Sequence, residues 1–296
     1  MIQKFFYRLA FFNYKRVRYR YMHQFLGLNP MKQIVKGLPI FYFSSQNKKP
    51  NLVLLHGLLD ASFGFRKLVP YLQREWNCIA IDLPSFGKSQ LPKIEAIHKI
   101  SFYTELLYDF FQHQNFKQIT LLGHSMGGLI AQHLALKDMN LDQRIQSLCL
   151  LSPGNSPHDK RDEFRNILFP KNTAEVQRLL GYLYNNEIPE ISENNAKALL
   201  YSWKKKEYEY LATNTINTEK EVFFGDKIKV LRVPTLIISG EKDEITPISS
   251  VRRMRSWIKG SKLELVANAK HAIHLEYPSE VAERISKHKK YLAISV

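Results

Sequence analysis

Cysteine and long apolar runs are scarce in this chain. Of its 296 residues, Cys78 and Cys149 are the two cysteines, too few for a disulfide framework. Both lie in short apolar runs typical of buried strands, so we expect reduced core thiols in a reducing compartment, with no redox role. The absence of any run of about 18 apolar residues argues against a helix that spans a bilayer. No repeat with a period of roughly 20 to 50 residues is present, which argues against a solenoid or a propeller.

Acidic residues are missing from the first part of the chain. Residues 1–59 carry ten Lys or Arg and no Asp or Glu, whereas residues 60–250 carry 23 basic and 23 acidic side chains. Residues 251–296 carry ten basic and four acidic side chains, and the net charge is +16. A neutral body with basic ends indicates one charged face that meets an anionic surface. The neutral centre argues against a nucleic-acid-binding protein.

The first thirty residues interleave aromatic and basic side chains. Lys4, Arg8 and Lys15 interrupt the apolar run and no small-residue cleavage site follows, so the segment does not resemble a secretory signal. The composition suits the headgroup region of an anionic membrane, which is the first interpretation. A helix that packs its Phe and Leu side chains on the body is the second, and single-stranded nucleic acid is the third. We treat residues 1–30 as a separate basic aromatic segment.

Short apolar runs recur along the rest of the chain and predict a mostly parallel sheet. A hairpin is expected first, because two β-rich segments flank a Lys36-Gly37 turn. Continuous apolar runs with helical spacing between them are typical of strands covered on both faces. The predicted strands are 33–35, 39–43, 52–55, 79–81, 119–122, 148–151, 235–238 and 263–266, and the clearest helices are 102–114 and 129–138. The fold class is therefore α/β, with a central sheet flanked by helices.

The alternation of strands and helices stops between residues 157 and 229. This segment is polar, helical in pattern and inserted between two strands, so we expect a helical cap over the carboxyl edge of the sheet. The core would then comprise residues 31–156 and 230–296. Some of the cap's aromatic residues should line a substrate cavity, but the sequence does not indicate which. The tyrosines and the tryptophan of this segment are Tyr182, Tyr184, Tyr201, Trp203, Tyr208 and Tyr210.

Ser125 is the candidate nucleophile. It lies in Gly123-His124-Ser125-Met126-Gly127, between a predicted strand and a predicted helix. A serine on such a sharp turn needs glycines two positions away on either side, because larger side chains there would clash. The turn exposes the serine Oγ above the sheet, and the following helix contributes backbone N–H donors.

A serine needs a base, and the base needs an orienting acid. On this architecture the acid follows the serine in the chain and the histidine follows the acid. Asp243 is the best acid, since it lies in the turn after the strand that ends near residue 239, and Glu241 and Glu244 are expected to be solvated.

The candidate bases are the histidines that follow Asp243. Of ten histidines in the chain, these are His271, His274 and His288. His271 lies nearest the end of the last strand and is preferred. His274 is the second candidate, otherwise a structural residue, and His288 is expected to be solvated in a Lys-rich helix.

Two backbone donors are expected to form an oxyanion hole. The N–H of Met126, directly after the nucleophile, is the first. The N–H of Leu58 is the second, because the His56-Gly57 turn follows an early strand. A simple tight turn is the alternative interpretation of His56-Gly57.

Together these motifs resemble the α/β-hydrolase superfamily over roughly residues 33–292. The resemblance implies Ser125 as nucleophile, His271 as base and Asp243 as acid, with Leu58 and Met126 as oxyanion donors and no cofactor or metal. The chain is most similar to capped bacterial lipases, esterases and monoacylglycerol-lipase-like enzymes, which often carry an N-terminal membrane-associating segment. The motifs that carry it are His56-Gly57, Asp82 to Ser89, Gly123 to Gly128, Gly240 to Asp243 with Pro247, and Lys270-His271.

The chain departs from the family pattern at two positions. Ser85 stands where relatives usually have Gly, and Lys270 precedes His271 where Gly is common. Some lipases place the acid after the preceding strand, but residues 152–155 contain no carboxylate, which supports Asp243. A serine nucleophile argues against epoxide hydrolases and haloalkane dehalogenases.

The leading hypothesis is hydrolysis of a small-molecule carboxylic ester with a fatty-acyl part, by a lipase or esterase. Two alternatives keep the same triad but cleave a thioester or the carbon–carbon bond of a ring-cleavage product. A non-catalytic ligand-binding protein would require a misplaced triad member. We expect a cytoplasmic protein, peripheral on the inner membrane face if residues 1–30 bind lipid. The sequence makes no prediction of oligomeric state.

Overall fold

The computed structural model describes residues 14–186 and 191–292. Residues 1–13 of the basic aromatic segment and 187–190 of the predicted cap lie outside the described residues. A sheet of eight strands forms the centre, in the order β1-β2-β4-β3-β5-β6-β7-β8. The strands are β1 (Asn29–Val35), β2 (Leu38–Ser44), β3 (Asn51–Leu55), β4 (Asn77–Ile81), β5 (Ile119–His124), β6 (Ile145–Leu151), β7 (Thr235–Gly240) and β8 (Lys262–Val266).

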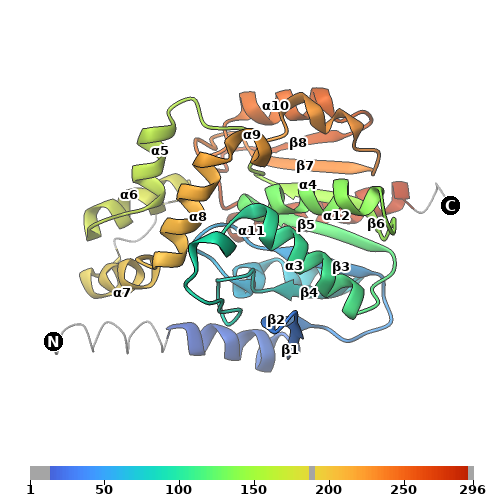
Figure 1. Cartoon of the computed structure of the whole chain (residues 1–296), viewed down its shortest axis with the longest axis horizontal. Helices are drawn as coiled ribbons and strands as arrows, with labels where there is room; N and C mark the ends of the chain where they lie inside the picture. The colour runs from blue at the N-terminus through green and yellow to red at the C-terminus, as the bar shows by residue number, and fades with distance from the viewer. Residues whose placement is uncertain (1–13, 187–190, 293–296) are drawn as a thin grey trace.

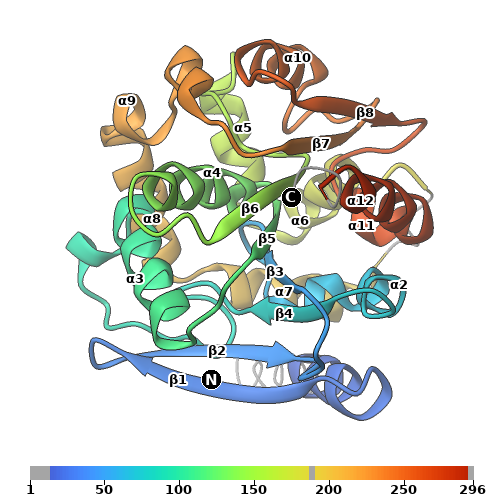
Figure 2. The ribbon, with the colours of Figure 1, turned by 90° about the vertical axis from the view of Figure 1, so that its right-hand side faces the viewer.

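Every strand expected from the sequence is present. β1 and β2 form the predicted antiparallel hairpin, turning at Lys36 and Gly37, both with positive φ, and β2 pairs antiparallel with β4. The pairs from β4 through β3, β5, β6 and β7 to β8 are all parallel. The mostly parallel α/β fold predicted from the apolar runs is therefore confirmed, and Figure 2 shows β1 and β2 at one edge of the sheet.

Helices cover both faces of the sheet because its strands are apolar on both sides. Val53 and Leu55 pack toward α3 (Ile100–His113), α4 (Met126–Met139) and α10 (Ile248–Trp257), whereas Leu52 and Leu54 pack toward α2 (Val69–Leu72) and α12 (Pro278–Leu292). Figure 2 shows these two layers with the sheet between them. Cys78 and Cys149 are buried free thiols in the second layer, where burial raises the pKa of each to about 12.

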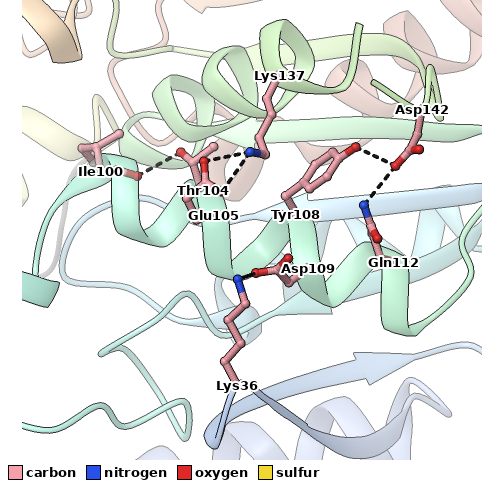
Figure 3. Close-up of polar contacts among 9 residues, drawn as sticks. All are labelled: Lys36, Ile100, Thr104, Glu105, Tyr108, Asp109, Gln112, Lys137 and Asp142. Carbon is pink, nitrogen blue, oxygen red and sulfur yellow. Dashed lines mark hydrogen bonds and ion pairs between the residues drawn. The ribbon is translucent and has the colours of Figure 1, made fainter. Parts of the chain in front are cut away.

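Polar contacts hold α3 against α4, the helix that begins at the candidate nucleophile. Lys137 of α4 forms an ion pair with Glu105 at 2.8 Å, and the Tyr108 hydroxyl donates to Asp142 at 2.6 Å (Figure 3). Lys36 of the hairpin turn forms an ion pair with Asp109 of α3 at 2.5 Å. The two ion pairs are solvent-exposed and contribute up to about 1 kcal/mol each, so α4 is fixed mainly by its apolar packing.

A helical insertion separates β6 from β7, and among the described residues it contains no strand. Figure 1 shows its longer helices gathered at one end of the sheet. Its elements are α5 (Arg161–Leu168), α6 (Thr173–Leu183), α7 (Glu193–Trp203), α8 (Lys206–Asn217), α9 (Glu219–Val222) and the 3₁₀ turn η4 (Gly225–Val230). Shorter segments elsewhere are η1 (Tyr21–Phe25), η2 (Ser62–Lys67), η3 (Glu95–Ile97) and α11 (Ile273–Glu276).

The described part of the basic aromatic segment is a helix that packs on the body. Residues 14–20 are helical and continue into η1. Tyr19 and Met22 are buried, and the Tyr19 hydroxyl donates to the buried Asp82 carboxylate at 2.5 Å. One face of residues 14–25 therefore packs on the body, but through Tyr19 and Met22; most of the Phe and Leu side chains expected to do so lie outside the described residues, and Phe25 is exposed. Among the described residues no helix combines the length and apolar character needed to cross a bilayer.

Candidate active site

Ser125 lies at the junction of β5 and α4 in a strained conformation. Its φ of 53° and ψ of −117° place it in a region that side-chain-bearing residues rarely occupy, at a cost of about 1–3 kcal/mol. The flanking glycines make this turn possible. A Cβ on Gly123 would lie 2.4 Å from the Gly127 carbonyl oxygen, and one on Gly127 would lie 2.1 Å from the Leu55 carbonyl oxygen. As the glycine spacing predicts, any larger residue at position 123 or 127 would clash with the neighbouring backbone.

Asp243 and His271 form a buried hydrogen-bonded pair. The Nδ1–H of His271 donates to the Asp243 Oδ2 at 2.9 Å, and both residues are less than 5% exposed. The carboxylate also accepts from the backbone N–H groups of Ile245 and Thr246 at 2.9 Å and from the Thr246 hydroxyl at 2.7 Å. Burial alone would raise the pKa of Asp243, but His271 and these donors lower it below its usual value. The carboxylate is therefore ionised at neutral pH and aims the imidazole.

The pair lies beside the nucleophile turn. Ser125 and His271 line the same pocket, and the His124 Nε2–H donates to the His271 carbonyl at 3.0 Å. No hydrogen bond joins the Ser125 Oγ to His271 in the described part of the chain; such bonds often form only once substrate is bound. Glu241 and Glu244 are exposed, so the structure brings only Asp243 of the three candidate acids to the histidine.

The other two candidate histidines have different surroundings. His274 is buried against His124 and Phe65, and within the described residues neither of its ring nitrogens has a hydrogen-bond partner. His288 is buried too, so its expected solvation was wrong; its ring packs inward while the neighbouring lysines account for the polar pattern. Among the described residues, no group of three or more His, Cys, Asp or Glu side chains could hold a metal ion.

Two backbone N–H groups adjoin Ser125 without acceptors. Those of Leu58 and Met126 donate no hydrogen bond within the described residues. A Cβ on Gly57 would lie 3.2 Å from the Ser125 Cβ, so the loop that carries Leu58 lies against the nucleophile. His56 fixes this loop. Its Nδ1–H donates to the Gly57 carbonyl at 2.8 Å, and its Nε2 accepts from the backbone N–H of Leu83, in the loop that follows β4, at 3.0 Å.

The helical insertion is tied to the histidine loop. The Lys270 ammonium donates to the Gly181 carbonyl near the end of α6 at 2.6 Å, and the Ala272 N–H donates to the Leu183 carbonyl at 2.8 Å. Lys270, one of the two departures from the family pattern, therefore caps α6. From α7, the Trp203 indole donates to the carbonyl of Leu59 in the other loop at 3.1 Å.

The second departure, Ser85, is accommodated by a buried polar network. Its φ of 75° is the left-handed conformation that favours glycine. Its hydroxyl lies 2.8 Å from the His98 Nδ1 and accepts from the Tyr103 hydroxyl at 2.8 Å. These hydrogen bonds stabilise Ser85 in a conformation that a glycine would adopt without side-chain support.

A pocket of about 180 Å³ opens above Ser125 and His271. A cavity that holds a single water has a volume of only about 10–15 Å³, so this pocket has room for an organic substrate. Of the tyrosines and the tryptophan in the insertion, Tyr184, Trp203 and Tyr208 line it. The rest of its apolar lining comes mainly from leucines and one isoleucine: Leu58, Leu59, Leu168, Leu179, Leu180, Leu183, Leu199, Ile245 and Leu275.

The pocket also contains residues that sequence reasoning missed. Tyr14, Lys15 and Arg18 of the N-terminal helix line it, together with Asp60 and Arg66. Positions 15, 18, 19 and 22 share one helical face, but Lys15 and Arg18 interrupt the apolar pattern that would indicate burial. Nothing in the local sequence indicates that it reaches the nucleophile, because that depends on where the helix docks.

Comparison with known proteins agrees with this fold. A family model described as "alpha/beta hydrolase fold" matches residues 50–181 and 184–278. The uncharacterized hydrolase YugF of Bacillus subtilis is 26% identical over 276 residues, covering 88% of this chain and 98% of the relative. The uncharacterized carboxylesterase nap of the same species is 24% identical over 252 residues, covering 82% and 80%.

A solved structure, that of a membrane phospholipase A described as a bacterial virulence factor, superposes with a TM-score of 0.82. It is 20% identical and covers 97% of this chain and 92% of its own, which is a likeness of fold. The family model spans more than half of the sequence. The chain therefore belongs to the α/β-hydrolase fold family.

Proposed function

We propose that this protein is a serine hydrolase that cleaves carboxylic esters with a fatty-acyl part. His271 takes the proton of the Ser125 hydroxyl, and the oxygen attacks the ester carbonyl. The backbone N–H groups of Leu58 and Met126 stabilise the oxyanion. His271 then protonates the leaving alcohol and activates the water that hydrolyses the acyl-enzyme. Asp243 orients His271 and stabilises its charged form.

One observation carries this proposal. A strained serine, a hydrogen-bonded His–Asp pair and two acceptor-free N–H groups gather around one pocket. Each of these features has a structural cost or leaves a polar group unsatisfied, so their coincidence is unusual in a merely structural turn. The carboxylesterase among the relatives is consistent with the same reaction.

The pocket lining supports an acyl substrate. Its apolar residues come from both loops beside Ser125 and from the helical insertion, and they suit a hydrocarbon chain. In this proposal residues 31–156 and 230–296 form the catalytic core, and residues 157–229 act as a cap that sets chain length. Monoacylglycerols are the finer candidate within this class, because their acyl chain is joined to a small polar alcohol.

The test is hydrolysis of p-nitrophenyl esters from acetate to palmitate. The wild type should hydrolyse them, with Ser125→Ala and His271→Ala lowering kcat by about 10³-fold or more. His274→Leu is the matched control and should retain activity within about tenfold, because His274 has no bond to Asp243. If His274→Leu lost as much kcat as Ser125→Ala while His271→Ala kept the wild-type kcat, the assignment of His271 as the base would be overturned.

We also propose that the outer face of the N-terminal helix rests on an anionic lipid surface. Val17, Tyr21 and Phe25 are 64%, 41% and 76% exposed and follow one another at intervals of four residues. They therefore form one stripe of an amphipathic helix whose opposite face holds the buried Tyr19.

Charge favours an anionic membrane as the occupant of this face. Arg16 and Arg20 of the same helix are exposed, and residues 1–59 contain no acidic side chain. Basic residues near such a surface contribute about 1 kcal/mol each. With two buried free thiols, this arrangement supports a peripheral protein on the cytoplasmic face of the membrane.

Vesicle sedimentation tests this second proposal. On phosphatidylglycerol vesicles, Arg16→Gln/Arg20→Gln should bind about 30-fold more weakly than the wild type, and Val17→Ser/Phe25→Ser should also bind more weakly. Leu141→Ser, which removes a 59%-exposed apolar side chain elsewhere, should bind as the wild type does. Equal binding by all four proteins would contradict the proposal.

A further inference from the structure

One wall of the active-site pocket is charged. Arg18 of the N-terminal helix and Arg66 of η2 line it, and Lys15 lies one helical turn before Arg18 on the same wall. Asp60 is the one carboxylate among the described residues that line the pocket. The remaining lining is apolar or uncharged apart from the histidines. The pocket thus combines an apolar region with a wall on which positive charge is in excess.

The two arginines outnumber the one carboxylate beside them, Asp60. The Arg18 guanidinium lies 4.1 Å from the centre of the Tyr14 ring, and Arg66 donates to the Phe63 carbonyl at 3.4 Å. In the described part of the chain, neither guanidinium forms an ion pair with a carboxylate. Partly buried charges are normally paired, so this pair of cations is unusual for a structural role.

Electrostatics within the wall point the same way. Burial lowers the pKa of Arg18 and the positive charge of Arg66 lowers it further, whereas Tyr14 and Asp60 raise it. Burial raises the pKa of Asp60, and the positive charges of Arg66 and Arg18 offset this only in part. An anionic group placed between the two guanidinium groups would relieve their repulsion.

We infer that the preferred substrate is an ester that carries a carboxylate or phosphate group, which Arg18 and Arg66 bind while the ester lies at Ser125. This inference rests on the proposed ester hydrolysis and names its substrate class. Guanidinium groups suit such oxyanions because their planar donor pairs match two oxygens at once. Arg18 and Arg66 are then specificity-determining residues, and the N-terminal helix is part of the substrate site.

The test compares substrates that differ only in this charge. p-Nitrophenyl hemiadipate and p-nitrophenyl hexanoate share the same six-carbon acyl chain, with a carboxylate replacing the terminal methyl group in the first. 1-Hexanoylglycerol 3-phosphate and 1-hexanoylglycerol provide the same comparison for a phosphate on the alcohol. We expect the wild type to have a kcat/KM at least tenfold higher for the anionic member of one pair, and the pair that shows it identifies the anion. Ratios near one for both pairs would overturn the inference.

Variants then assign the preference to the arginines. Arg18→Gln and Arg66→Gln should each reduce the ratio of kcat/KM for the anionic ester to kcat/KM for the neutral ester about tenfold or more. Arg18→Lys should restore part of the preference because it keeps the charge. Arg16→Gln is the matched control, since it removes an exposed charge from the same helix, and it should keep the wild-type ratio. A preference that survives both pocket substitutions would contradict the assignment.

The failure of this inference is distinguishable from failure of the proposed function. If neutral esters are cleaved in a Ser125-dependent way without any anion preference, ester hydrolysis stands and the inference falls. If no ester is cleaved, the proposed function falls, and binding tests the charged wall directly. Adipate or glycerol 3-phosphate should raise the Tm of the wild type and not that of Arg18→Gln/Arg66→Gln. No rise in the wild type would overturn the inference.

Discussion

His274 should make this protein sensitive to mild acid. Its ring is 1% exposed, packed beside His124 and Phe65, and within the described residues neither nitrogen has a hydrogen-bond partner. Burial, and then the charge on His271 and Arg66, lowers the pKa of His274 to about 3. The folded protein therefore keeps this ring neutral at a pH where an unfolded chain, with a histidine pKa of about 6.5, binds a proton.

The size of the effect follows from proton linkage. Because the unfolded chain binds more protons than the folded one between the two pKa values, stability falls as the pH is lowered through this window. From pH 7 to pH 5, His274 alone removes about 2 kcal/mol from the free energy of unfolding. Replacing it with Leu removes that contribution. At pH 7 the change should be small, because an unpartnered polar ring gives way to an apolar side chain.

Urea unfolding at pH 7 and pH 5, followed by tryptophan fluorescence, measures this difference. The wild type should lose about 2 kcal/mol more than His274→Leu between the two pH values. His113→Gln is the control, since His113 is exposed, and it should behave as the wild type does. If His274→Leu loses as much stability as the wild type, the ring is not held neutral and this account of its surroundings is wrong.

Three further substitutions test separate parts of the structure. Gly127→Ala should destabilise the fold by roughly 3 kcal/mol or more in thermal unfolding, because its methyl group would meet the Leu55 carbonyl oxygen 2.1 Å away; Gly181→Ala, with open space around it, should not destabilise it. Asp243→Asn should lower kcat by about 10³–10⁴-fold with KM little changed, and an unchanged kcat would exclude its role in orienting the base. Tyr19→Phe should lower the free energy of unfolding by about 1–3 kcal/mol by removing a buried hydrogen bond to a carboxylate, and no loss would show that the N-terminal helix is held by apolar packing alone.

Much of the fold follows from local signals. Strands buried on both faces need continuous apolar runs, so β3 and β5 are evident in the sequence. The turn at Ser125 is equally local, because the positions of Gly123 and Gly127 are set by contacts with the neighbouring backbone. Strand ends are less well defined: β4 begins at Asn77, two residues before the apolar run that predicts it.

The rest depends on contacts between distant parts of the chain. Arg18 reaches the pocket only because the N-terminal helix docks through Tyr19 on Asp82, 63 residues away in sequence. Ser85 occupies a glycine-like conformation because His98 and Tyr103 happen to meet its hydroxyl. Neither the Lys-rich surroundings of His288 nor the polar pattern of its helix indicates that the ring turns inward.

The central claim is that Ser125 is an activated nucleophile in this pocket. Incubation with a fluorophosphonate, followed by intact-mass and peptide mass spectrometry, tests it without any assumption about the substrate. The account predicts a single phosphonyl adduct on Ser125, abolished by Ser125→Ala and much slower in His271→Ala. An adduct on another residue, or labelling of the wild type no faster than that of Ser125→Ala, would contradict it.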